Sequence, residues 1–175
     1  MTAKMDRRTF LKTTAAAVVA VSMSGMLTGC GESEPENAVK ITLGEYEVSM
    51  TPKVAISGSE TGGAGAGAEG TYLFVPGVTI RYNGDATIVS VPFKNVFSAK
   101  LGAEEAKLKN GNSMIAAVDL PFGKNKTYAP QFSFTPDAYK AYKNEGGTLK
   151  VTVTLQGQSA VFSLTHAGSC TVAKV

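Results

Sequence analysis

The stretch LKVTVTLQGQSAVFSLT, residues 149–165, decides the fold class of this chain. Apolar and polar residues alternate in it with period two, as in a half-buried β-strand, on both sides of a glycine-containing turn. A three-residue loop, 156–158, would place Val151 opposite Ser163. A two-residue Gly157-Gln158 loop places Val151 opposite Leu164 and Val153 opposite Phe162. We predict the two-residue hairpin, with Gly157 supplying the positive φ of a type II′ turn.

A second hairpin is predicted at Asn83-Gly84, a strong signal for a two-residue turn. Tyr82 would then face Asp85, and Val78 would face Val89. Pro76 and Pro92 fall nearly side by side in this register, and neither can donate a ladder hydrogen bond. We therefore expect the hairpin to break, to kink or to lie at a sheet edge there.

The chain also alternates from Val39 onward, but the parity changes at Gly44-Glu45, which predicts a β-bulge or kink. Residues 57–70 (SGSETGGAGAGAEG) predict a flexible surface loop. This loop contains the letters of a dinucleotide-binding fingerprint. A strand pattern at 71–75 follows it, whereas the fingerprint requires a helix, so the nucleotide interpretation is rejected.

Further strands are expected around 96–101, 113–122 and 131–134. Short helices are expected at 103–109, from a Glu105/Lys109 pair, and after Thr135-Pro136-Asp137, with a stop at Gly146. In the second helix, Tyr139 and Tyr142 share one face, and packing on the sandwich edge is favoured over ligand binding. These elements predict an all-β fold, an antiparallel β-sandwich of about seven to nine strands with one or two short helical turns.

The strand rhythm of residues 39–165 resembles the Ig-like domains of small bacterial lipoproteins of unknown function. The resemblance implies an Ig-like β-sandwich spanning residues 39–175 and a short helical connection before the last two strands. The chain contains no tryptophan, which excludes the Cys…Trp…Cys core of antibody domains.

The N-terminus reads as an export signal, with a charged head, a weakly apolar run and small residues. It resembles a twin-arginine signal through Arg7, Arg8, Phe10, Leu11 and Lys12. It also resembles a lipobox, formed by Leu27, Thr28, Gly29 and Cys30. The resemblance implies cleavage of residues 1–29, lipidation of Cys30 and anchoring to the outer face of the cell membrane. The alternative is an uncleaved membrane anchor.

The net positive charge of the chain disappears once the signal is removed. Residues 1–30 hold four of the 17 Lys and Arg residues and one of the 14 Asp and Glu residues, so thirteen of each remain. A neutral domain gives no support for nucleic-acid binding. Residues 30–38 form an acidic tether that is expected to hold the domain off the membrane.

Few residues could carry chemistry. His166, placed opposite Leu149 by the predicted register, is interpreted as a partly buried structural histidine, and a Cys170/His166 nucleophilic pair remains an alternative. One histidine cannot complete a blue-copper or zinc site, and no calcium-binding loop occurs, so no metal or cofactor is expected. The acidic residues that could form a glycosidase pair are Glu104, Glu105, Asp119 and Asp137.

These observations favour a non-catalytic, lipid-anchored binding or scaffolding module of the cell envelope. Its expected partners are the membrane, through the lipid, and an envelope protein or glycan, but not nucleic acid. One alternative is an accessory subunit of an exported redox or transport complex, because twin-arginine export typically carries folded proteins, often with a cofactor. The other is an envelope hydrolase.

Overall fold

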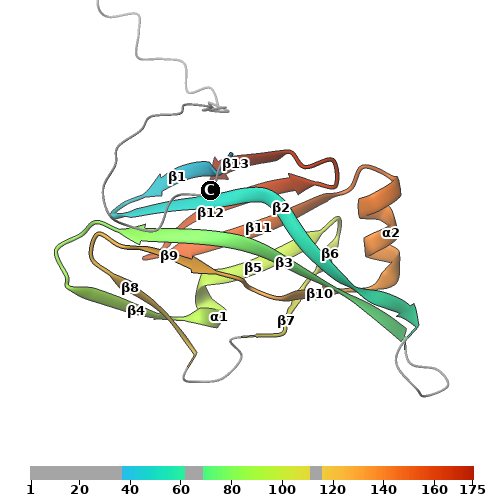
Figure 1. Ribbon diagram of the computed structural model, residues 1–175, viewed down its shortest axis with the longest axis horizontal. Helices are drawn as coiled ribbons and strands as arrows, with labels where there is room; N and C mark the ends of the chain where they lie inside the picture. Colours follow the sequence, from blue (N-terminus) through green and yellow to red (C-terminus); the bar gives the residue numbers. More distant parts are fainter. Residues whose placement is uncertain (1–36, 62–68, 111–115) are drawn as a thin grey trace, which may run out of the picture.

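The computed structural model describes residues 37–61, 69–110 and 116–175, which form two antiparallel sheets that face each other and a two-stranded ribbon beside them (Figure 1). The β3 sheet contains, in spatial order, β1 (Val39–Leu43), β2 (Tyr46–Thr61), β3 (Glu69–Tyr82), β10 (Phe132–Phe134) and β7 (Lys107–Leu108), and β9 (Asn125–Tyr128) also pairs with β3. The β11 sheet contains β13 (Cys170–Lys174), β12 (Gln158–Thr165), β11 (Thr148–Leu155), β5 (Phe97–Leu101) and β6 (Glu104–Glu105). The ribbon consists of β4 (Ile88–Pro92) and β8 (Ala117–Pro121), and the helices are α1 (Phe93–Val96) and α2 (Pro136–Asn144).

The core lies between the two sheets. Alternate residues of each strand point inward, so Phe74 and Phe132 of the β3 sheet meet Val151 and Phe162 of the β11 sheet in one fully buried cluster. The predicted all-β antiparallel sandwich with short helices is therefore confirmed. The described residues contain thirteen strands, more than expected, because the ribbon and two-residue strands such as β6 add to the sandwich.

The β11–β12 hairpin has the predicted two-residue loop, but the loop is Gln156-Gly157, one residue earlier than predicted. Val151 consequently faces Phe162 rather than Leu164. Gln156 and Gly157 have φ values of 48° and 75°, as in a type I′ turn, whose twist matches that of the flanking strands. The register differs by two residues, an even number, so the predicted buried face is still correct.

The parity change at Gly44-Glu45 is a hairpin turn and not the predicted bulge. Leu43 pairs directly with Tyr46, and Gly44 adopts a φ of 60°. A two-residue turn shifts the apolar parity of the following strand, which explains why the two cases look alike in sequence. The register irregularity in β2 lies instead between Met50 and Val54.

The hairpin predicted at Asn83-Gly84 is wrong. Val78 pairs with Met50 of β2 and with Tyr128 of β9, whereas β4 leaves the β3 sheet and pairs with β8. The Asn83 N–H donates to the Glu45 carbonyl at 2.8 Å, so residues after β3 run on past the β1–β2 turn instead of turning back to pair with β3. Long-range pairing with β2 and β9 therefore prevails over the local turn signal.

One predicted helix forms and the other does not. Thr135 caps α2 by accepting the Ala138 N–H at 3.4 Å, and Gly146 follows the helix with a φ of 69°, as predicted. Residues 104–105 and 107–108 are strands, so the helix predicted at 103–109 is wrong. Glu105 pairs with Lys100 of the neighbouring strand, at 2.8 Å, instead of Lys109.

Strand predictions at 96–101, 113–122 and 131–134 are confirmed by β5, β8 and β10, although 111–115 lie outside the described residues. The loop predicted at 57–70 is wrong at both ends, because β2 continues to Thr61 and β3 begins at Glu69. Residues 62–68 lie outside the described part. Tyr139 and Tyr142 pack against Phe74 at the sandwich edge, as predicted.

Candidate functional site

A groove runs along the side of the sandwich where each sheet ends in an edge strand. β1 is the outermost described strand of the β3 sheet and β13 is that of the β11 sheet, and the two contact each other near the top of Figure 1. The groove has a volume of about 530 Å³. It is lined by Lys40, Ile41, Thr42, Glu47, Val172, Ala173 and Lys174.

The groove has an apolar floor and charged rims. Ile41 and Val172 are half-buried and pack against the core from opposite sheets. Lys40 Nζ lies 3.9 Å from Glu47 Oε1. Lys174 Nζ donates to Gln158 Oε1 at 2.8 Å, so this ammonium group is held at the end of the groove near the Gly44 turn.

Both edge strands turn main-chain groups away from their own sheets. A two-residue hairpin closes on a hydrogen-bonded pair, here Leu43 and Tyr46, so the preceding residue Thr42 directs its N–H and C=O away from β2. The Val175 N–H donates to the Ser159 carbonyl at 3.0 Å. By the same alternation, Val172 and Lys174 direct their backbone groups away from β12. Such edges can accept an extended polypeptide as an added strand.

His166 lies elsewhere and is exposed, so it is not the partly buried residue that we predicted. Because Leu149 faces Leu164, His166 falls beyond the end of β12, in an exposed turn. Its ring contacts the edge of the Tyr142 ring, with centroids 5.6 Å apart and an interplanar angle of 82°. The shifted hairpin register accounts for the error.

Cys170 begins β13 opposite Leu164 and packs partly against the core. This burial raises the pKa of the Cys170 thiol to about 11. A nucleophilic cysteine needs the opposite shift, since the thiolate is the reactive form. The environment of Cys170 thus favours an inert, packed thiol and argues against the Cys170/His166 pair.

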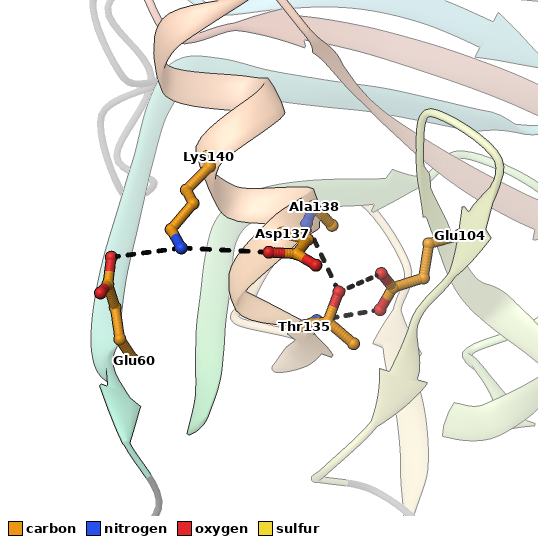
Figure 2. A network of polar contacts seen from close by, with 6 residues as sticks. All are labelled: Glu60, Glu104, Thr135, Asp137, Ala138 and Lys140. Atoms are coloured by element: carbon orange, nitrogen blue, oxygen red, sulfur yellow. Dashed lines mark hydrogen bonds and ion pairs between the residues drawn. The ribbon is translucent and has the colours of Figure 1, made fainter. Parts of the chain in front are cut away.

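Two of the candidate acids make contacts at α2: Glu104 reaches the start of the helix from β6, and Asp137 pairs within the helix (Figure 2). The Glu104 carboxylate accepts the Thr135 N–H at 2.9 Å and the Thr135 hydroxyl at 2.6 Å. Lys140 lies 3.9 Å from Asp137 and 3.8 Å from Glu60, which joins the helix to β2. These carboxylates act as structural contacts on the outside of the domain.

The other two acids lie on separate elements. Glu105 bonds to Lys100, and this hydrogen bond, together with the lysine charge, lowers the pKa of the Glu105 carboxyl. Asp119 lies in β8, where its backbone carbonyl accepts the Tyr128 hydroxyl at 2.8 Å. The four acids therefore do not converge on one cavity. Across the described ranges, no three His, Cys, Asp or Glu residues are grouped as metal ligands would be.

Sequence reasoning missed the groove because it missed β13. The alternation of Cys170 and Val172 with Thr171 and Ala173 was the available signal, but it is short and weak. The pairing of β12 with β13 makes this signal meaningful. No helix within 37–61, 69–110 or 116–175 has the length and apolar character needed to cross a membrane.

The predicted export and lipidation residues, from Arg7 to Cys30, lie outside the described residues. Residues 4–24 match the profile of the twin-arginine translocation (TAT) pathway signal sequence. The chain carries a twin-arginine export signal. This signal directs the protein across the membrane, as the Arg7-Arg8 motif predicted, whereas lipidation of Cys30 stays a prediction.

Two solved structures show similarity to this chain. A candidate lipoprotein (ycdA) from Bacillus subtilis aligns with 9% sequence identity and a TM-score of 0.42, over 81% of this chain and 39% of its own. A functionally unknown protein from Listeria monocytogenes aligns with 10% identity and a TM-score of 0.45, over 78% of this chain and 80% of its own. The chain thus spans 39% of the length of the Bacillus protein. No curated protein matches the sequence.

Proposed function

We propose that this protein is a lipid-anchored module at the outer face of the cell membrane, which binds an envelope protein without catalysis. The lipobox Leu27-Thr28-Gly29-Cys30 follows closely after the matched export signal. Removal of residues 1–29 makes Cys30 the first residue, and its diacylglyceryl group supplies the two acyl chains that stable anchoring needs. Residues 30–38 then tether the sandwich of residues 39–175.

The groove between β1 and β13 carries the binding part of the proposal. An extended segment of a partner adds to the Thr42 edge by main-chain hydrogen bonds and places alternate apolar side chains on Ile41 and Val172. Lys40 and Lys174 outnumber Glu47 among the lining residues, which favours a segment that also carries a carboxylate. A protein partner is preferred to a glycan because the site offers strand edges.

The anchor is tested by membrane fractionation of cells that express Cys30→Ala. The wild-type protein is expected in the membrane fraction and labelled by a radioactive fatty acid, and Cys30→Ala is expected to lose both properties. Cys170→Ala is the matched control, because it removes the other cysteine and keeps the lipobox. Complete membrane retention of Cys30→Ala would support the uncleaved anchor instead.

The groove is tested by photo-crosslinking from a benzophenone amino acid at Ala173, which is exposed in the groove. Thr42→Pro removes an edge N–H from the exposed side of β1, whereas Thr42→Ala keeps it. The crosslinked partner is expected with Thr42→Ala and is expected to disappear with Thr42→Pro. Circular dichroism checks that both variants fold. Equal crosslinking by the two folded variants would rule out strand addition at β1.

A further inference from the structure

Two large apolar side chains are exposed at one end of the β4–β8 ribbon, one on each of its faces. The exposed fractions are 57% for Ile88 and 58% for Phe122. Ile88 pairs directly with Pro121, and Phe122 is the next residue. We call Ile88, Pro121 and Phe122 the apolar tip. The Phe122 N–H donates to the Thr87 carbonyl at 3.0 Å, so the backbone of the tip is fixed.

The ribbon presents the tip because neither sheet covers its outer side. Val118 and Leu120 point from β8 into the core and are fully buried, whereas Ile88, Ser90 and Pro92 of β4 point outward and are exposed. In Figure 1 the ribbon lies at the lower left, at the opposite end of the sandwich from α2. Phe122 has the parity of Leu120 but lies beyond the covered part of β8, so this end of the ribbon carries exposed apolar side chains on both faces and can contact an apolar surface end-on.

The charges close to the tip along the chain are balanced. Within four residues of Ile88 or Phe122, Lys124 and Lys126 are matched by Asp85 and Asp119. None of the four forms a side-chain ion pair with a described residue. Contact at the tip therefore gains little from an oppositely charged surface and depends on burial of the apolar side chains.

Chain geometry places the bilayer within reach of the tip. The seven residues from Gly31 to Asn37 span at most about 23–25 Å. The five residues of β1, which lead from this point to the Gly44 turn, cover only about 17 Å. That turn adjoins the ribbon end of the molecule, because Asn83 bonds to Glu45 and Phe122 forms a bridge with Tyr82. A lipid on Cys30 and the tip can thus reach the same bilayer.

We propose that the apolar tip lies in the interfacial layer of the bilayer to which the lipid anchor holds the protein. This inference rests on the proposed anchoring through Cys30. Two side chains give weak membrane affinity on their own, but the anchor keeps them within a tether length of the surface and so raises their effective concentration. The contact turns the β1–β2 turn toward the membrane and the α2 end of the sandwich away from it, so it differs from the expectation that the acidic tether holds the whole domain off the surface.

The test uses the absence of tryptophan from the chain, which makes a single introduced tryptophan an unambiguous reporter. The acylated Phe122→Trp protein, purified from membranes, is reconstituted into phosphatidylcholine vesicles with or without brominated acyl chains. Bromine quenches a tryptophan only at short range. The expected result is a roughly twofold loss of emission in brominated vesicles and a blue-shifted spectrum, both unchanged by added salt because the local charges balance.

Lys143→Trp is the matched control, because Lys143 is exposed in α2 at the other end of the domain and its tryptophan should stay unquenched. Ile88→Trp gives a second reporter within the tip if Phe122→Trp does not fold. Vesicle flotation reports the anchor separately. A protein that floats while its tip tryptophan emits like Lys143→Trp overturns the tip contact and leaves the anchor standing. A protein that does not float overturns both.

Discussion

The Glu104→Ala substitution is expected to destabilise the domain by releasing the start of α2 from β6 (Figure 2). Glu104 is half-buried, and its carboxylate accepts two hydrogen bonds from Thr135, at 2.9 Å and 2.6 Å. Thr135 is also the residue that caps α2. The substitution therefore removes the link between the β11 sheet and the helix and leaves two donors of Thr135 to water.

The size of the effect follows from the exposure of these bonds. A hydrogen bond to a charged group contributes about 1.5–3 kcal/mol when it is shielded from water. Both bonds of Glu104 lie near the surface, so we assign about 0.5–1 kcal/mol to each and about 1–2 kcal/mol to the pair. For a domain of this size, that loss lowers the melting temperature by about 3–8 °C.

Two further variants give the prediction a graded form. Glu104→Gln keeps one acceptor oxygen and is expected to lose roughly half as much stability. Glu105→Ala removes the neighbouring carboxylate, which pairs with the exposed Lys100 on the surface, and is expected to melt like the wild type. Thermal and urea unfolding, followed by far-ultraviolet circular dichroism, measure all three. If Glu104→Ala melts together with Glu105→Ala, the helix is not held through Glu104.

Two other predictions concern alkaline pH. Burial raises the pKa of the Cys170 thiol to about 11. In a Cys30→Ala background, alkylation of Cys170 in the native protein should therefore be slow at pH 9 and accelerate toward pH 11, and the domain should lose stability over the same interval. Fast labelling at pH 8 would contradict the buried environment. Burial, assisted by the charge of Asp119, raises the pKa of Tyr128 to about 12, so its contribution to stability is complete below pH 10 and is lost as the pH rises through 12. Tyr128→Phe should cost about 0.5–1.5 kcal/mol at neutral pH, through loss of the bond to the Asp119 carbonyl, and should remove the share of the alkaline transition that Tyr128 contributes, while the raised pKa values of Tyr46 and Tyr142 still contribute theirs.

Features encoded by neighbouring residues could be predicted from the sequence. The Thr135-Pro136-Asp137 start and the Gly146 stop of α2 are local signals, and the structure bears both out. The β11–β12 hairpin was assigned the correct faces, although its turn lies one residue earlier than predicted. Its position depended on whether Gln156 would accept a positive φ, which propensity alone disfavours.

Features that depend on distant pairing could not be predicted. The Asn83-Gly84 signal was outweighed by β9, which pairs with β3 from far along the chain. The groove is lined by Lys40 and Lys174, which lie near opposite ends of the sequence of the domain, and the β4–β8 pairing places Ile88 opposite Pro121, next to Phe122. Each of these sites can be recognised only from the strand topology, and the periodicity of the sequence does not reveal that topology.

The pairing of β3 with β10 also bears on the timing of export. Phe74 and Phe132 are direct neighbours in the β3 sheet, but a large part of the domain separates them along the chain. Contacts between such distant residues close slowly, because the entropy of the intervening loop must be overcome first, and β-sandwiches accordingly fold in milliseconds to seconds. The twin-arginine pathway typically carries proteins that are already folded. For this protein, the slowest strand closure in the cytoplasm then sets the earliest moment at which the chain is ready for transport.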